Sequence, residues 1–180
     1  QALVFKGGTA LRLAWSGNRY SEDLDFDSPP MDAEMANVGG LRLLWDQVVS
    51  GLEDYGIHAQ VRNEWDSDVG CSFDVSYQGP LYDGRDGTKG KVRVDINSRP
   101  EIVEINRRLV SSEYDDVFPF VVTVLTPSHM LAEKVRALMM RGIPRDLYDI
   151  WLLLSQGVPL DRDLIERKLA WVGLTFVGEE

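Results

Sequence analysis

Alternating acidic and apolar residues near the N-terminus constrain the fold of this chain more than any other feature. In the run from Asp23 to Asp27, an aspartate occupies every second position, and Leu24 and Phe26 lie between them. Successive side chains of a β-strand point to opposite faces, so this alternation predicts a strand over Ser21–Phe26. One face of that strand would pack on a core, and the other would carry the carboxylates.

Two interpretations of the acidic face remain open. Carboxylates two residues apart on a strand lie about 6.5–7 Å apart, and their repulsion is tolerated either in water or around a cation. The face is therefore either the solvated surface of an edge strand, where charge discourages aggregation, or part of a metal site. In the second interpretation, Asp23 and Asp25 share the metal and Asp27 is a solvated residue beyond it.

A glycine-rich turn precedes the aspartates. Leu3–Phe5 is typical of a short buried strand, and Gly7, Gly8 and Thr9 form a turn into a helix expected over Thr9–Ser16. Backbone N–H groups at a helix N-terminus can bind a phosphate, and the threonine hydroxyl can add a donor. Carboxylates on a neighbouring strand could then hold Mg²⁺, which favours one or two carboxylates together with substrate phosphates.

A third acidic residue lies in a later strand-like run, Lys91–Ile96. If the apolar residues Val94 and Ile96 face a core, Asp95 faces the other way together with Arg93. This placement is compatible with a third carboxylate in the metal site. It is equally compatible with an ordinary exposed alternation.

The remaining periodicity predicts an α+β fold with a mixed or antiparallel sheet. Strands are expected at Ile57–Glu64, Cys71–Tyr77, Val92–Asn97, Ile102–Val110 and Phe120–Leu125, and helices at Met31–Tyr55, Met130–Arg141, Arg145–Ser155 and Asp161–Val172. We expect an α/β core over residues 1–125 and a helical region packed on it over residues 126–180. The tryptophans are expected in the core or at interfaces rather than as platforms for bases.

Composition limits the class of partner. The net charge of −10 argues against a broad polyanion-binding surface, although a local patch could still bind nucleic acid or a nucleotide. The arginines that could form such a patch are Arg99, Arg107, Arg108, Arg136 and Arg141. No apolar run approaches the roughly 20 residues that span a bilayer, so we expect a soluble protein without a membrane partner.

Cysteine and histidine usage adds little to the site. Cys71 is the single cysteine, which suits a reducing cytoplasm, and His58 and His129 are isolated, so no zinc pattern is formed. The chain begins at Gln1 inside the first expected strand, and we expect further residues upstream.

These residues together resemble a known family. A GG[T/S] turn, an acidic-hydrophobic-acidic triplet and a later strand aspartate form the pattern of the DNA polymerase β-like nucleotidyltransferase superfamily. More narrowly, Lys6–Arg12 and Arg19–Phe26 are similar to the AbiEii/AbiGii toxin family of type IV toxin–antitoxin and phage-defence systems. The resemblance resumes in Glu133–Arg136 and Arg145–Asp149, which match that family's helical lysine motif and its RDxxD motif.

The resemblance implies a polymerase β-like core that transfers a nucleoside monophosphate from an NTP with the help of Mg²⁺ or Mn²⁺. It implies catalytic roles for Asp23, Asp25, Asp95, Lys134 and Asp146, of which the first three would bind the metal. It implies nucleotide contacts for Lys6, Gly7, Gly8, Thr9 and Lys134. It also implies a cytoplasmic toxin with a cognate antitoxin.

The helical motifs have a simpler explanation as well. Lys134 and Arg141 lie close to one helix face, and Asp146 and Asp149 to one face of the next helix, so they could form ordinary ion pairs. As a hypothesis, Asp146 positions Lys134 for the triphosphate or helps to activate an acceptor hydroxyl. Arg145 could pair locally with Asp149.

The acceptor and the class of activity also stay open. An RNA end, above all that of a tRNA, a protein hydroxyl and a small aminoglycoside-like molecule would use the same metal chemistry. A metal-dependent phosphodiesterase and a non-catalytic nucleotide-binding module are the competing classes. Ser21 is a candidate regulatory phosphorylation site, because a phosphate on the strand face of Asp23 would crowd the metal site with negative charge.

Overall fold

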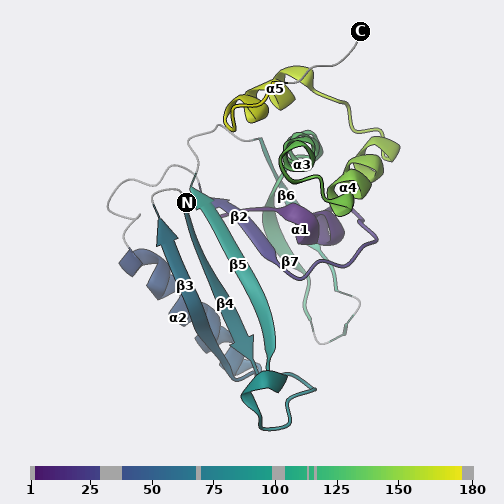
Figure 1. Ribbon diagram of the computed structural model, residues 1–180. Coiled ribbons are helices and arrows are strands. Elements are labelled where there is room, and N and C mark those ends of the chain that lie inside the picture. Colours follow the sequence, from purple (N-terminus) through teal and green to yellow (C-terminus); the bar gives the residue numbers. More distant parts are fainter. Residues whose placement is uncertain are drawn as a thin grey trace. The chain divides into compact units, whose positions relative to one another are not determined.

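The structure is a computed structural model that describes residues 3–28, 38–67, 70–98, 104–112, 114–115 and 117–175 (Figure 1). The chain forms two compact units that alternate along the sequence. The first unit comprises Gln1–Phe5 and Ser21–Glu101, and the second comprises Lys6–Tyr20 and Ile102–Glu180. The predicted division at residue 125 stays a prediction.

The first unit is a mixed sheet with one long helix. Its elements are β1 (Val4–Lys6, of which Lys6 belongs to the second unit), β2 (Leu24–Ser28), α2 (Val38–Asp54), β3 (Ala59–Ser67), β4 (Gly70–Tyr77) and β5 (Gly90–Ser98). The strands follow the order β3-β4-β5-β2-β1. β3, β4 and β5 pair antiparallel, whereas β2 and β5 pair parallel, which confirms the predicted mixed sheet.

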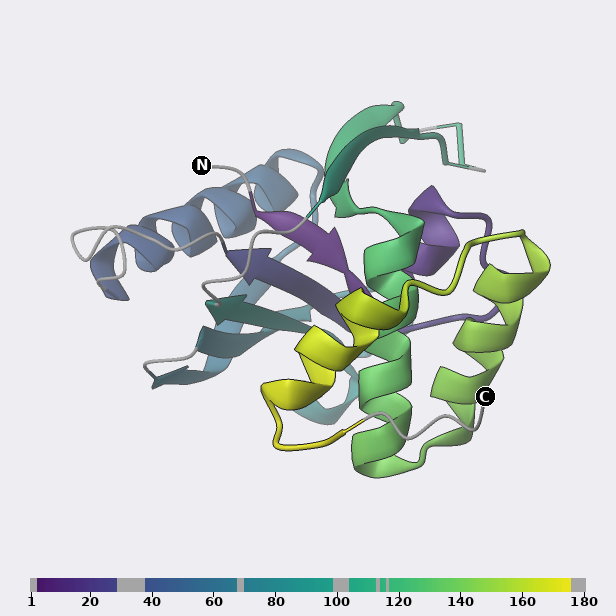
Figure 2. The same cartoon turned by 90° about the horizontal axis from the view of Figure 1, so that it is seen from above.

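The period of two decides which sheet face is buried. A core cluster on one face joins α2 to the strands, and its members are Trp45, Cys71, Phe73, Val75, Val94 and Ile96. Leu24 and Phe26 of β2 pack against the same cluster, and α2 lies along this side of the strands (Figures 1 and 2). The alternate residues of β2, β4 and β5, among them Asp25 and Asp95, therefore lie on the opposite, polar face.

The second unit combines a hairpin with four helices. Its elements are α1 (Gly7–Ala14), β6 (Ile105–Val110), β7 (Phe120–Leu125), α3 (Pro127–Arg141), α4 (Pro144–Ser155) and α5 (Arg162–Ala170). Thr126 caps α3 by accepting the N–H of His129, and Pro127 occupies the first turn, where a missing N–H has no cost. Gly142 ends α3 at a φ of 61°, and α3 packs on both α4 and α5 (Figure 2).

Most predicted elements are confirmed within a few residues. β7 coincides with its prediction, and the three C-terminal helices differ from theirs by up to three residues at either end. Residues 29–37, which include the expected start of the Met31–Tyr55 helix, lie outside the described residues. No helix in the described part of the chain is long and apolar enough to cross a membrane.

The tryptophans divide into two groups. Trp45 is buried in the core, where its ring centroid lies 4.6 Å from that of Phe73. Trp65, Trp151 and Trp171 are exposed and do not lie in the core, so an interface position stays a prediction for these three.

Candidate active site

Two carboxylates of the predicted site lie side by side in the first unit. Asp25 of β2 and Asp95 of β5 are register partners in the parallel pair, on strands about 4.8 Å apart. Aligned residues of neighbouring strands point to the same face, which here is the polar face opposite α2. Two residues that are 70 positions apart in sequence thus form an acidic pair.

The predicted ladder of three aspartates on one strand is wrong in two respects. β2 begins only at Leu24, so Ser21 and Asp23 precede the strand. Just before them in the chain, Arg19 donates to the Tyr20 carbonyl at 3.1 Å. Asp27 is 7% exposed, which contradicts its interpretation as a solvated residue.

The acidic pair fits a metal that binds together with substrate. No group of three His, Cys, Asp or Glu residues is arranged to hold a metal ion in the described ranges. Mg²⁺, however, is commonly bound by one or two carboxylates plus phosphate oxygens and water, rather than by a complete protein cage. Asp25 and Asp95 supply that ligand set, whereas a third ligand from Asp23 stays a prediction.

Arg93 lies against Asp95 on the polar face. Its Nη2 donates to Ser72 Oγ at 2.7 Å, and its Nε lies 3.5 Å from Asp95 Oδ1. Its Nη1 lies 3.4 Å from Asp74, a buried carboxylate that accepts from Asn63 at 2.7 Å. The hydrogen bond from Asn63 and the nearby positive charges lower the pKa of Asp74 despite its burial.

The turn that is predicted to bind phosphate lies in the second unit. α1 starts at Gly7, two residues before the expected start, and the φ of 78° at Gly7 is one that side chains with a Cβ rarely adopt. Lys6 occupies the N-cap position without a side-chain cap bond, and the first turn holds no acidic residue. Such a helix start suits an anion, because the N-cap side chain makes no cap bond and the first turn itself carries no negative charge.

Lys6 belongs to a buried charge cluster around Glu133. Glu133 accepts from Lys168 at 2.8 Å and from Arg136 at 2.6 Å. Burial alone would raise the pKa of Glu133, but the charges of Lys168, Lys6 and Arg136 hold it well below its usual range. Arg136 is therefore paired with Glu133 inside the unit, and its side chain is 12% exposed.

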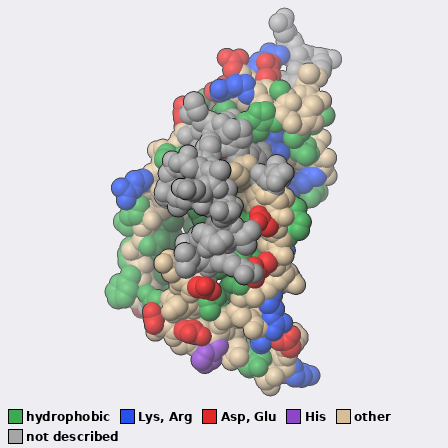
Figure 3. Space-filling view, turned by 90° about the vertical axis from the view of Figure 1, so that its left-hand side faces the viewer, with side chains coloured by type: hydrophobic (Ala, Val, Ile, Leu, Met, Phe, Trp, Pro, Cys, Tyr) green, Lys and Arg blue, Asp and Glu red, His purple; other side chains and the backbone are tan. Residues whose placement is uncertain are grey.

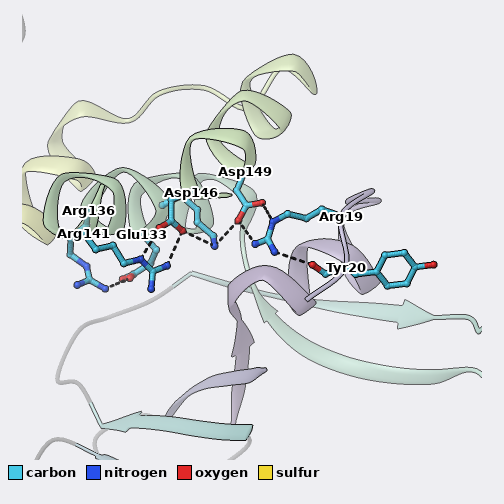
Figure 4. A network of polar contacts seen from close by, with 8 residues as sticks. Arg19, Tyr20, Glu133, Arg136, Arg141, Asp146 and Asp149 are labelled. Carbon is cyan, nitrogen blue, oxygen red and sulfur yellow. Dashed lines mark hydrogen bonds and ion pairs between the residues drawn. The ribbon is translucent and has the colours of Figure 1, made fainter. Parts of the chain in front are cut away.

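Lys134 lies between two buried carboxylates, those of Asp146 and Asp149. Figure 4 shows these two aspartates with their arginine partners. The Nζ of Lys134 is 3.3 Å from Asp146 Oδ1 and 2.7 Å from Asp149 Oδ2. Asp146 also accepts two bonds from Arg141, at 2.7 and 2.9 Å, and Asp149 accepts two from Arg19, at 2.8 and 2.7 Å. Each carboxylate is thus shared by the lysine and one arginine, which fixes the position of the ammonium group.

Sequence reasoning missed Arg19. Arg145 was the predicted local partner of Asp149, but it is exposed, and the arginine bound to Asp149 comes from 130 residues away. The hydrogen bond to Asp149 raises the pKa of Arg19. Arg19 belonged to the Arg19–Phe26 motif, but sequence reasoning assigned it no role, and this motif was the only indication that it matters.

The predicted arginines that lie within the described residues do not form one surface. Arg99 lies outside the described residues, and Arg136 and Arg141 are bound to acidic residues. Arg107 and Arg108 are neighbours on β6 and so point to opposite faces, and Arg108 stacks over the Trp15 ring at 4.7 Å. On the face drawn in Figure 3, acidic and basic side chains are scattered among apolar ones.

Solved structures from Helicobacter pylori have this fold. JHP933 is 21% identical with a TM-score of 0.61, and the alignment covers 96% of this chain and 66% of that one. A candidate nucleotidyltransferase from H. pylori is 22% identical with a TM-score of 0.62, over 95% of this chain and 66% of that one. This chain thus spans slightly under two thirds of each, and at these identities the likeness concerns the fold, which is that of a nucleotidyltransferase.

A family model gives a more specific assignment than the fold does. A family model described as the nucleotidyl transferase AbiEii toxin of the type IV toxin–antitoxin system matches residues 1–180. The chain therefore belongs to the AbiEii family. No curated protein gave a match.

Proposed function

We propose that this chain transfers a nucleoside monophosphate from an NTP to the 3′ end of an RNA, such as a tRNA, as a toxin of a type IV toxin–antitoxin system. The observation that carries this proposal is the pairing of Asp25 with Asp95 on one sheet face. Membership of the AbiEii family supports both the reaction class and the existence of a cognate antitoxin. A role in phage defence belongs to the same proposal.

The reaction is an in-line displacement. The acceptor hydroxyl oxygen attacks the α-phosphorus, a new P–O bond forms, and the bond from the α-phosphorus to the bridging oxygen breaks. Pyrophosphate leaves with the electron pair, and the hydroxyl proton passes to Asp95 or to water. Asp23, Asp25 and Asp95 would hold Mg²⁺ or Mn²⁺, which when bound supplies neutralising charge for the phosphoryl group.

The second unit would hold the triphosphate. Backbone N–H groups of Gly7, Gly8 and Thr9 would bind its phosphates, and the Lys6 and Lys134 ammonium groups would balance their charge. Asp146 supports this role for Lys134 because it contacts the ammonium group at 3.3 Å. In this proposal Asp146 positions the lysine rather than acting on the substrate itself.

The test uses the pure protein, Mg²⁺, each α-³²P-labelled NTP in turn, and total tRNA with lysate protein as acceptors. We expect label in an RNA band and its loss in Asp25→Asn and Asp95→Asn. Asp83→Asn, in an exposed loop of the same unit, is the matched control and should transfer normally. Undiminished transfer by a folded Asp25→Asn protein would refute the assignment.

The same gel separates the alternatives. Label in a protein band would identify a protein-nucleotidylating enzyme, and RNA loss without NTP would identify a phosphodiesterase. Nucleotide binding without any labelled product would identify a non-catalytic module.

Ser21 is proposed as a point of control by the antitoxin. It is half-buried and begins the segment that leads to Asp23. A phosphate there would bring negative charge close to the proposed metal ligands. Intact-mass analysis after co-expression with the neighbouring gene should show one added phosphate, and an unmodified Ser21 would count against this control.

A further inference from the structure

The acidic pair continues into a row of side chains across the sheet. In the antiparallel pairs, Ser72 of β4 is opposite Asp95, and Trp65 of β3 is opposite Ser72. Trp65, Ser72, Asp95 and Asp25 therefore lie on one face in consecutive strands. From the strand spacing, Trp65 is about 10 Å from Asp95.

A β-bulge brings Trp65 onto this face. Arg62 pairs with Asp74 and Trp65 pairs with Ser72, so β3 advances three residues where β4 advances two. Without the extra residue, Trp65 would point to the apolar side. Asn63 adopts a φ of 52° in the bulge, and its amide donates to the buried Asp74 at 2.7 Å.

The indole ring of Trp65 is available to a ligand. The residue is 57% exposed, although it lies within a strand. Bulges often re-aim a side chain next to an active site, and an aromatic ring exposed on a sheet is the usual platform for an unpaired base.

Two cations lie beside this row. Lys91 and Arg93 lie four and two residues before Asp95 on β5, so their side chains point to the same face as Asp95. The Lys91 side chain is 62% exposed, and its ammonium is 3.8 Å from Asp74. Arg93 makes one short bond, to Ser72, whereas its contacts with Asp74 and Asp95 are 3.4 and 3.5 Å. These long contacts constrain the Arg93 guanidinium less than the short bond to Ser72 does, so phosphate oxygens can be added to its partners.

We propose that this polar face binds the single-stranded end of the acceptor RNA. Trp65 stacks on a base, and Lys91 and Arg93 contact backbone phosphates, which leads the terminal hydroxyl toward Asp95. The inference rests on the proposed function, in which the donor phosphates are bound at the Gly7–Gly8 turn. Lys91 and Arg93 are then left to contact phosphates of the acceptor. An acceptor with backbone phosphates is a polynucleotide rather than a protein or an aminoglycoside-like molecule.

The test measures RNA binding without turnover. A fluorescein-labelled single-stranded octaribonucleotide is titrated with protein in Mg²⁺, without NTP, and its anisotropy is followed from 50 to 200 mM KCl. For single strands, log K falls with log salt by about 0.7 for each phosphate contact. Lys91→Gln and Arg93→Gln should each reduce the slope by about 0.7, whereas Arg85→Gln, an exposed loop arginine of the same unit, should not.

Trp65 should behave differently from the cations. Trp65→Leu should weaken binding by about fivefold or more with an unchanged salt slope, because stacking involves no counterion release. Trp65→Phe should retain most of the affinity. Trp151→Leu is the matched control, because Trp151 is 59% exposed on α4 and lies outside the proposed face.

Three results would overturn the inference. These are no binding of the octaribonucleotide by the unaltered protein at 50 mM KCl, equal affinities of the Trp65→Leu and Trp151→Leu proteins, and unchanged slopes in both cation variants. Thermal melting keeps these results interpretable, because Lys91 and Trp65 are exposed and their variants should melt like the unaltered protein. Failure of NTP label transfer alone would refute the proposed function and leave the binding result to be judged separately.

Discussion

Arg19 holds both carboxylate oxygens of Asp149, at 2.8 and 2.7 Å, and so ties the segment before β2 to helix α4. The same carboxylate receives the Lys134 ammonium at 2.7 Å. Two cations thus share one buried acid, and the position of the lysine depends on a residue that is distant in sequence.

Removal of this arginine should destabilise the protein. Hydrogen bonds to charged groups contribute about 1.5–3 kcal/mol each, so Arg19→Ala should lower the free energy of unfolding by at least about that amount. Arg19→Lys should recover only part of the loss, because lysine cannot make the two-pronged contact. Urea unfolding measures the effect, and equal stability of Arg19→Ala and the exposed-site control Arg145→Ala would contradict the prediction.

Acid should weaken the cluster around Asp146. Burial alone would raise the pKa of Asp146, but the hydrogen bond from Arg141 and the charge of Lys134 lower it below its ordinary value. A carboxyl with a lowered folded-state pKa stabilises the protein above its unfolded pKa of about 3.9, and this contribution is lost as the pH falls further. Stability should therefore fall below about pH 4.

The control for acid sensitivity is Asp146→Asn. This variant should be less stable at pH 7, but its urea midpoint should change less than that of the unaltered protein between pH 5 and pH 3. An identical pH dependence in the two proteins would show that Asp146 does not contribute to acid sensitivity.

Cys71 should be chemically inert in the folded protein. Burial, with smaller contributions from the charges of Asp66 and Asp95, raises the pKa of its thiol to about 11. The thiolate is the reactive form, so an aromatic disulfide reagent at pH 8 should react slowly with the native protein and rapidly in concentrated urea. Similar rates in the two conditions would place Cys71 outside the core.

Truncation of Phe73 tests the core of the first unit. Phe73 is 4% exposed and packs against Trp45. Phe73→Ala should cost about 3–5 kcal/mol of unfolding free energy through lost burial and the resulting cavity. Leu81→Ala, at a residue that is 88% exposed, should change stability by less than about 0.5 kcal/mol. Comparable urea midpoints for the two variants would contradict this account of the core.

Local alternation was sufficient to predict most of the sheet. Val94 and Ile96 face the core, and Asp95 faces the other way, as a strict period of two requires. The same reasoning, extended to Trp65, would place its side chain on the wrong face, because the bulge adds one residue and reverses the parity of the strand beyond it. The local sequence pattern does not predict the extra residue of this bulge.

Long-range contacts were beyond sequence reasoning for a different reason. The helix spacing of Asp146 and Asp149 indicated ion pairs, but Arg19 as the partner of Asp149 depends on tertiary packing. Asp27 shows the same limit, because an alternating pattern indicates the face of a residue and not how deeply it is buried.

The chain passes back and forth between the two units, and this limits which gene fragments can encode a complete unit. The polypeptide passes from one unit to the other after Phe5, after Tyr20 and again after Glu101. Neither unit therefore corresponds to one uninterrupted stretch of a gene. A gene fragment that encodes residues 21–101 would lack β1, and one that encodes residues 102–180 would lack α1 and Arg19. A continuous fragment that carries one unit whole must also carry part of the other unit and leaves that other unit incomplete, so recombination preserves both units only when it passes them on together.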